Sequence, residues 1–267
     1  MTDELGQPAT NSFDRRASVY GSGWMAYFWD FGRLLVDEVT VAPGAVALDV
    51  AAGTGAVALP LARRGARVLA LDVSRSMLAQ FPGATATFPI VRVLGSGQAL
   101  PLPAASVDVV TCGFGIAFFP DLSGALAEMR RVLRPAGQLA LTWWHFDVPT
   151  PWVEANRIIG ALDVDGTCRL RRMNELADPV VVERHVRDAG FTSPRVRPFG
   201  LEWTEESVAA FRDARISIWE RERSLPVPPE TPKRLQAATA GWVASDGKLR
   251  YPLRAFAVLA DGTCSSS

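Results

Sequence analysis

The sequence predicts an α/β fold built on a mainly parallel β-sheet. Two observations lead to this prediction. From Val46 onward, short apolar runs alternate with segments of helix length, and a glycine turn directly follows the first apolar run. A chain of 267 residues with 48% hydrophobic and 21% charged residues can bury the core of one such domain. We expect that domain over residues 13–262, after a disordered lead-in at residues 1–12 and before a tail at residues 263–267.

Each apolar run of strand length is expected to contribute one strand. The expected strands are Val46–Val50, Val68–Asp72, Ile90–Leu94, Val107–Cys112, Gln138–Trp144, about Arg195–Leu201 and Arg254–Ala260. Helical spacing, caps and helix-ending glycines mark the segments between them. The expected helical segments are Phe13 to about Val41, the stretch that ends near Arg64, Ser74–Gln80, the stretch capped by Asp121, and Asp178–Gly190.

Residues 203–247 interrupt this alternation. Thr204 and the two glutamates after it favour the start of a helix in which Phe211 and Ile218 share one face. A proline-rich connector, Pro226–Pro232, and a further helix follow. We expect this insertion and the aromatic N-terminal helices to form a helical lid over the carboxyl edge of the sheet.

Composition and charge exclude several classes of protein. Lys and Arg together number 28, as do Asp and Glu, so the chain lacks the basic surplus of a nucleic-acid binder. Three widely spaced cysteines argue against a disulfide framework and against a zinc site, so we expect no metal. The polar N-terminus is unlike a signal peptide, and no apolar run reaches the roughly 20 residues that span a bilayer. We expect a cytoplasmic protein that binds neither nucleic acid nor membrane.

The glycine turn after the first strand is the first candidate binding feature. Gly53 and Gly55 let the backbone approach a ligand closely, and the helix that follows presents free amide groups. Asp72 ends the second strand 17 residues beyond Gly55, where a carboxylate can accept two hydrogen bonds from a ribose diol. These features alone are typical of many nucleotide-binding folds.

Two longer stretches narrow the choice. The stretch VALDVAAGTGAVALPLARRGARVLALDVSRSML resembles motif I and the second-strand motif of class I S-adenosylmethionine-dependent methyltransferases. The stretch QALPLPAASVDVVTCGFGIAFFPDLSGALAEMRRVLRPAGQLAL resembles the later motifs of that family, in order and spacing. Its CGFGIAFFPD segment is most similar to the ubiquinone/menaquinone-biosynthesis C-methyltransferases, in the methyltransferase type 11 group. The resemblance runs from about Phe13 to Trp144, and the DAGF of Asp188–Phe191 extends it.

The resemblance implies a Rossmann-like sheet of seven strands, with the last strand antiparallel, and S-adenosyl-L-methionine as the cofactor. It also implies which residues line the methionine and methyl end of the cofactor site: Asp49, Ala51, Gly53 and Gly55 in the first turn, Cys112, Gly113 and Phe114 at the end of the fourth strand, and Tyr20, which would close over the cofactor.

The ribose and adenine end is implied in the same way. Asp72 would bind the ribose hydroxyls, and Val73, Met77, Gly97 and Gln98 would contact the adenine. Ser96 stands where the family usually has an aspartate that accepts from the adenine amino group, and it keeps the hydrogen bond without the charge. A second departure is Ala51, which replaces the family's usual first glycine.

Several of these residues also have a purely structural interpretation. Asp49 can cap backbone groups in the turn, Asp72 can be an exposed strand-end acid, and Met77 can belong to the core. Cys112 is expected to act through its backbone or as a small buried apolar group rather than as a nucleophile. Tryptophans 24, 29, 143, 144 and 152 can line an acceptor pocket or build core.

The two histidines differ in their expected positions. His185 lies in a helical segment between apolar residues, where a structural role is expected. His145 follows the fifth strand on the carboxyl edge, where ligands of open α/β sheets lie. Because the ordinary pKa of histidine is near 6.5, His145 is the candidate general base.

We therefore expect methyl transfer to oxygen or carbon of a small, hydrophobic or aromatic acceptor in quinone or specialised metabolism. Two alternatives stay open. One is a protein of the same fold that binds the cofactor without transferring methyl, as a cyclase or in a structural role. The other is an NAD-dependent oxidoreductase, although the turn lacks Gly-x-Gly-x-x-Gly and the chain has no Tyr-x-x-x-Lys pair.

Overall fold

The computed structural model describes residues 13–15, 17–18, 20, 26–83, 87–145, 147–160, 175–223 and 225–262. The expected lead-in at 1–12 and tail at 263–267 lie outside the described residues, as does Trp24.

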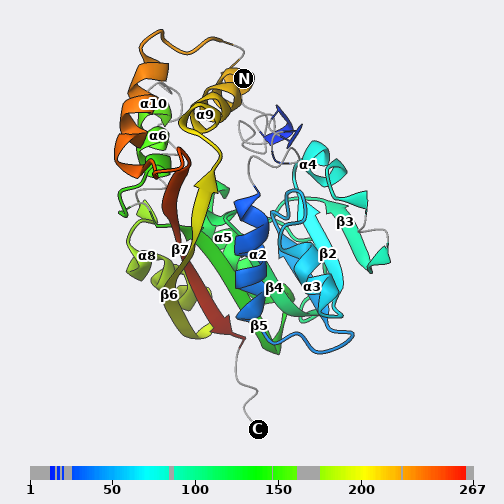
Figure 1. Ribbon diagram of the computed structural model, residues 1–267. Helices are drawn as coiled ribbons and strands as arrows, with labels where there is room; N and C mark the ends of the chain where they lie inside the picture. The colour runs from blue at the N-terminus through cyan, green and yellow to red at the C-terminus, as the bar shows by residue number, and fades with distance from the viewer. Residues whose placement is uncertain are drawn as a thin grey trace, which may run out of the picture.

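A seven-stranded sheet with the order β3-β2-β1-β4-β5-β7-β6 forms the centre of the molecule (Figure 1). The strands are β1 (Val46–Val50), β2 (Arg67–Asp72), β3 (Ile90–Leu94), β4 (Val107–Gly113), β5 (Leu133–Trp144), β6 (Thr192–Glu205) and β7 (Leu249–Asp261). The pairs among β1 to β5 are all parallel, whereas β7 runs antiparallel to both β5 and β6. The expected sheet with an antiparallel last strand is confirmed.

Helices cover both faces of the sheet, with α2 and α3 in front and α5 behind in Figure 1. The helices and 3-10 turns are α2 (Tyr27–Asp37), α3 (Ala58–Arg63), α4 (Arg75–Ala79), η2 (Ile116–Phe118), α5 (Leu122–Val132), α6 (Pro151–Gly160), α8 (Pro179–Asp188), α9 (Val208–Arg223), α10 (Thr231–Thr239) and η3 (Ala240–Trp242). Among the helices that the structure describes, none has the length and apolar character required to cross a bilayer.

Local sequence sets the ends of several helices. The Asp121 carboxylate accepts from the Gly124 N–H at 3.0 Å and caps α5, as expected from its position. Asp178 caps α8 in the same way, with Pro179 in the first turn. Gly190 follows α8 with a φ of +88°, a backbone conformation that suits glycine.

The position of the crevice follows from the strand order. The chain leaves β1 toward β2 on one side, while it leaves β4 toward β5 on the other side. Between such strands the connections diverge, and open α/β sheets bind their ligands there, beyond the carboxyl ends. The turn after β1 and the segment after β4 border this point.

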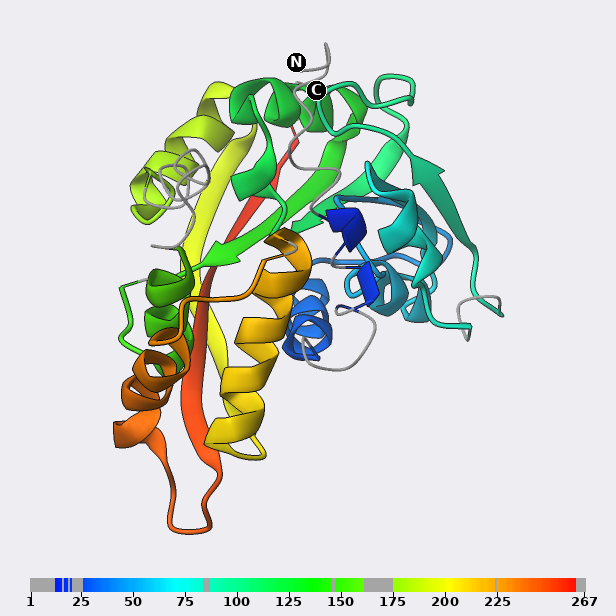
Figure 2. The same ribbon diagram turned by 90° about the horizontal axis from the view of Figure 1, so that it is seen from above.

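Strands β6 and β7 extend beyond the rest of the sheet as a two-stranded ribbon. Their ladder continues to the pair Glu205 and Leu249. Helices α6, α9 and α10 gather around the outer part of the ribbon (Figures 1 and 2). Buried side chains of α2, β5, α6, α9, α10 and the ribbon form one apolar cluster, called the lid cluster below: Tyr27, Phe31, Trp144, Trp152, Val153, Ala155, Ile158, Phe211, Leu235, Leu249, Tyr251, Leu253 and Ala255.

The ribbon corrects the expected bounds of the insertion. Residues 203–205 belong to β6, and the helix expected from Thr204 begins at Val208 instead. Trp203 pairs with Tyr251 across the ladder, and the cross-strand hydrogen bonds outweigh the local preference for a helix start. The sixth and seventh strands are therefore longer than Arg195–Leu201 and Arg254–Ala260.

The fifth strand also begins earlier than expected. Strand β5 starts at Leu133, directly after α5, rather than at Gln138. Leu133 pairs with Val107, and the register then shifts before Gln138 pairs with Val109. Arg134 forms an ion pair with Asp108 of β4. The segment Arg134–Gly137 is thus an irregular part of the strand and not a separate turn.

Candidate functional site

The turn after β1 has the backbone conformation that its glycines suggest. Gly53 has a φ of +55° and Gly55 a φ of +94°. A side chain at Gly55 would lie 2.6 Å from the Phe81 ring, so both conformation and space require glycine there. The turn lies at the carboxyl edge of the sheet, next to the start of α3.

Ala51 adopts the same left-handed region, with a φ of +56°. Residues with a Cβ pay for this conformation with strain of about 1 kcal/mol. A side chain at Gly115 would lie 2.6 Å from the Ala51 methyl, which shows how closely the segment after β4 approaches the turn. The family's usual glycine is thus replaced at a position where the backbone conformation favours glycine.

Asp49 is buried beneath the turn. One carboxylate oxygen accepts a hydrogen bond from Thr111 Oγ1 at 2.7 Å, and the other, Oδ2, has no partner among the described residues. Burial raises the pKa of Asp49 from 3.8 to about 7, against the lowering effect of the Thr111 hydrogen bond. A buried acid with an unused oxygen is suited to a positively charged or hydrogen-donating ligand group.

Asp72 lies at the carboxyl end of β2 and joins the turn to α4. Its two oxygens accept from the Gly53 and Ser74 N–H groups, each at 2.8 Å. Burial raises the pKa of Asp72, while these two hydrogen bonds act to lower it. Each carboxylate oxygen can accept a further hydrogen bond, so the contacts leave capacity for a ribose diol. Asp72 is only 7% exposed, and it is not the exposed strand-end acid of the structural interpretation.

The residues beside Asp72 differ in their surroundings. Val73 is 40% exposed, an apolar surface next to the acid. Met77 is buried, and its Cε lies 3.2 Å from where a Cβ on Gly53 would be. Ser74 caps α4 by accepting from the Met77 N–H at 3.0 Å. Met77 therefore packs against the glycine turn at the site expected for adenine.

The N-terminal segment crosses this part of the site. Asp14 accepts hydrogen bonds from the Ser74 hydroxyl and, at 3.3 Å, from the Ser76 N–H. Tyr20 stacks on Phe28 with ring centroids 5.5 Å apart. Sequence inspection identified Tyr20 but missed Asp14, because nothing in the local pattern around Asp14 indicates its partner on α4.

The loop after β3 carries the other expected adenine contacts. Ser96 Oγ accepts from the Gln98 N–H at 3.1 Å. The Gln98 side chain bonds both backbone groups of Asp121, donating to the carbonyl at 2.8 Å and accepting from the N–H at 2.9 Å. A side chain at Gly97 would lie 3.0 Å from Val50 Cγ1 and 2.7 Å from Phe119. The Gln98 amide therefore fastens this loop to the start of α5.

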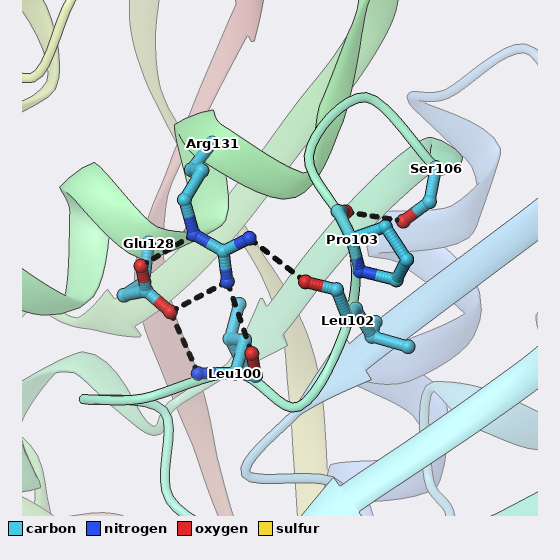
Figure 3. Close-up of polar contacts among 6 residues, drawn as sticks. All are labelled: Leu100, Leu102, Pro103, Ser106, Glu128 and Arg131. Carbon is cyan, nitrogen blue, oxygen red and sulfur yellow. Dashed lines mark hydrogen bonds and ion pairs between the residues drawn. The ribbon is translucent and has the colours of Figure 1, made fainter.

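An arginine of α5 holds the continuation of the same loop (Figure 3). Arg131 forms two hydrogen bonds to Glu128 and donates to the carbonyls of Leu100 and Leu102 at 3.0 and 2.8 Å. Glu128 also accepts from the Leu100 N–H at 2.7 Å. Ser106 donates to the Pro103 carbonyl at 2.7 Å farther along. These contacts fix the loop on α5, so the segment at Ser96–Gln98 has a rigid support.

The end of β4 forms the third side of the crevice. Cys112 is fully buried, and burial raises the pKa of its thiol, which supports the expected role as a small apolar group. A side chain at Gly113 would lie 2.8 Å from Val57 of the first turn. Phe114 has a φ of +62° and donates its N–H to the Thr142 carbonyl at 3.0 Å.

Phe114 joins an aromatic cluster beyond the strand ends. Its ring centroid lies 4.2 Å from that of Trp144 and 5.3 Å from those of Phe28 and Phe31. Trp152 lies 4.4 Å from Trp144. Trp144 and Trp152 thus belong to the lid cluster, whereas Trp143 belongs to another core cluster and donates to the Leu176 carbonyl at 2.8 Å.

The two histidines lie in different parts of the structure, and neither contacts the turn after β1 within the described residues. His185 of α8 has its Nδ1 3.1 Å from Ser123 Oγ of α5, a helix-to-helix contact that fits the expected structural role. His145 lies directly after β5, at the carboxyl edge, as expected. Its ring packs 4.3 Å from that of Phe256, which belongs to the same core cluster as Trp143 and not to the lid cluster. The contacts within the described residues do not join His145 to the turn after β1.

Comparisons with known proteins identify the family of this chain. A family model described as a methyltransferase domain matches residues 48–141. Nocamycin O-methyltransferase of Saccharothrix syringae is 31% identical over 250 residues, which cover 90% of this chain and 82% of that protein. Demethylmenaquinone methyltransferase of Renibacterium salmoninarum is 42% identical over 118 residues, 44% of this chain and 48% of that protein. The residues matched by the family model include the turn after β1 and the ends of β2 and β4.

The fold is also similar to that of a solved methyltransferase structure. The structure of phosphoethanolamine N-methyltransferase 2 from Haemonchus contortus, in complex with S-adenosyl-L-methionine, has a TM-score of 0.57 at 16% identity. The match covers 88% of this chain and 53% of that chain, and it shows a shared fold. Nocamycin O-methyltransferase, which aligns along 90% of this chain, decides against the oxidoreductase alternative. The chain belongs to the class I methyltransferases, enzymes that use S-adenosyl-L-methionine as their cofactor.

Proposed function

We propose that this enzyme transfers a methyl group to oxygen or carbon of a small hydrophobic or aromatic metabolite. The aromatic cluster of Phe28, Phe114, Trp144 and Trp152 carries the proposal, because it lies beyond the ends of β4 and β5, where an acceptor must meet the cofactor. The names of two relatives, nocamycin O-methyltransferase and demethylmenaquinone methyltransferase, are compatible with an acceptor from specialised or quinone metabolism.

The donor and acceptor groups of the crevice fit the cofactor. Oδ2 of Asp49 is buried without a partner among the described residues, and it suits the positively charged methionine end. Asp72 keeps acceptor capacity for the ribose diol, beside the exposed apolar surface of Val73. When bound, S-adenosyl-L-methionine supplies a methyl group activated by a sulfonium. We assign the residues named above to its binding on these grounds.

The remaining task of the protein is to position the acceptor and exclude water. Aromatic rings on the lid side offer a flat apolar surface, and holding the acceptor at near-attack distance contributes up to several kcal/mol to catalysis. A general base helps only where the acceptor must lose a proton. His145 stays the candidate base on the strength of its place at the carboxyl edge alone, since its ring packs against Phe256 and outside the lid cluster.

The experiment is to incubate a metabolite extract with the enzyme and methyl-labelled cofactor, then search for labelled products by mass spectrometry. Asp72→Ala serves as the matched control, since it should weaken cofactor binding and leave the aromatic cluster unchanged. Calorimetry should show micromolar binding of S-adenosylmethionine and S-adenosylhomocysteine and no binding of NAD. Labelled products confined to proteins or nucleic acids would contradict the proposed acceptor class.

A further inference from the structure

One face of helix α9 carries three buried side chains, one of which is charged. Phe211, Arg215 and Trp219 follow each other at helical spacing, and their exposed fractions are 0%, 8% and 7%. The face packs into the lid cluster, against Tyr27 of α2 and Tyr251 of β7. An arginine in the middle of such a face is rare, because burying a charge without a partner is costly.

Arg215 has no such partner among the described residues. Its Nε makes no hydrogen bond, and no ion pair to it is found in the described part of the chain. Its guanidinium lies 5.1 Å from the centre of the Phe211 ring. Glu205 is the acid in its vicinity, but that carboxylate already accepts from Trp203 Nε1 at 3.1 Å and from Tyr251 Oη at 3.3 Å. Since arginine stays protonated, a positive charge persists inside the lid cluster.

One further donor on this face lacks a partner within the described residues, namely Nε1 of Trp219. The hydroxyl of Tyr27 lies beside the Arg215 guanidinium and interacts with it. The indole and guanidinium N–H groups can only donate. A group that satisfies both must therefore supply acceptor atoms, and beside a guanidinium it is favoured when it is negatively charged.

The series is connected to the proposed site of methyl transfer. Tyr27 lies 5.8 Å from Trp144 and 4.8 Å from Phe28, ring centre to ring centre. Phe28 lies 5.3 Å from Phe114, which follows the end of β4. Tyr27 and the guanidinium beside it thus border the aromatic cluster. An acceptor whose aromatic part packs on that cluster can extend a polar group toward α9.

We propose that Arg215, with Trp219 and Tyr27, binds a carboxylate on the methyl acceptor. The inference rests on the proposed function and specifies its substrate class as an aromatic or hydrophobic carboxylic acid. Arg215 acts here as a specificity-determining residue: its planar guanidinium matches the two oxygens of a carboxylate and rejects a neutral analogue. It takes no part in the transfer itself.

A pair of probes tests the inference: 1-hydroxy-2-naphthoate and its neutral amide, 1-hydroxy-2-naphthamide. Binding is measured by calorimetry on protein saturated with S-adenosylhomocysteine. The acid should bind the wild type at least about tenfold more tightly than the amide, since the charged hydrogen bonds are worth about 1.4 kcal/mol or more. Arg215→Gln should abolish the preference, and Arg215→Lys should keep part of it. Arg212→Gln is the matched control, because Arg212 of the same helix pairs with Asp213 at 2.8 Å.

Thermal unfolding supplies a second readout. The acid should raise the melting temperature of the wild type and leave that of Arg215→Gln unchanged, because a ligand stabilises only the protein that binds it. An equal rise in both proteins would overturn the inference.

Three binding results would also overturn it: equal affinity for acid and amide in the wild type, a preference that survives in Arg215→Gln, or binding of neither probe. These results are distinct from a failure of the proposed function. Only a wild type that does not bind S-adenosylhomocysteine would reject the inference and the proposed function together.

Discussion

Replacing Asp49 by asparagine should remove a pH dependence of folding that the wild type shows between pH 5 and 8. The pKa of Asp49 rises from 3.8 to about 7 on folding, because the carboxylate is buried. The folded state thus holds its proton to a higher pH than the unfolded state does. The stability associated with this proton is complete at low pH and is lost as the pH rises through 7.

The two pKa values set the size of the effect. A rise from 3.8 to about 7 corresponds to about 4 kcal/mol in full, at 1.36 kcal/mol per pKa unit. Between pH 5 and 8 the wild type should lose about 2–3 kcal/mol of that amount. The amide of Asp49→Asn keeps an acceptor for Thr111 and carries no titrating proton. We expect the variant to be about 2 kcal/mol more stable than the wild type at pH 8, after allowance for the unpaired amide.

Urea unfolding of both proteins without cofactor, at several pH values, measures this difference. The remaining titratable groups are common to both proteins, so subtracting the two curves isolates Asp49. Parallel curves for the two proteins would refute the assignment of a raised pKa. Cofactor binding gives an independent reading. Because a positive ligand favours the carboxylate, wild-type affinity should rise about tenfold from pH 6 to 8, and Asp49→Asn should lack this rise.

Four further substitutions test the site. Ala51→Gly should stabilise the protein by about 0.5–1 kcal/mol in urea unfolding, by relieving the positive φ, and a loss of stability would contradict that reason. Asp72→Ala should weaken S-adenosylhomocysteine binding by about 2–3 kcal/mol in calorimetry, and normal binding would refute the ribose assignment. Ser96→Asp should leave cofactor binding unchanged or tighter, whereas much weaker binding would mean that this loop differs from that of the family. His145→Ala should slow an oxygen methylation by about 10²–10⁴-fold, and near-normal turnover with an unchanged pH profile would assign the rate to positioning.

The cofactor half of the site could be predicted because its features are local in sequence. A strand, a glycine turn and a helix follow one another within Val46–Arg63, and the acid at the end of the next strand, Asp72, meets the turn through the Gly53 N–H. Parallel βα units bring successive strand ends to the same edge, so the order of motifs is enough to place these residues together. Caps such as Asp121 were likewise readable from a few neighbouring residues.

The lid half depended on contacts between distant segments. Residues 203–205 can form either a helix start or a strand. They form a strand because Trp203 pairs with Tyr251. Asp14 acquires its role only where the N-terminal segment meets Ser74. No property of the sequence around Arg215 distinguishes it from a solvated arginine of an exposed helix face.

The sequence by itself determined the fold class, the cofactor and the residues of the glycine turn, since these follow from short-range patterns and ordered motifs. Only the tertiary structure decided the length of the β6–β7 ribbon, the burial of Asp49 against Thr111, and the enclosure of Arg215 among aromatic rings. The physical reason is that burial and hydrogen-bond partners are supplied by segments far apart in the chain. A raised pKa or an unpartnered charge exists only after those segments have packed together.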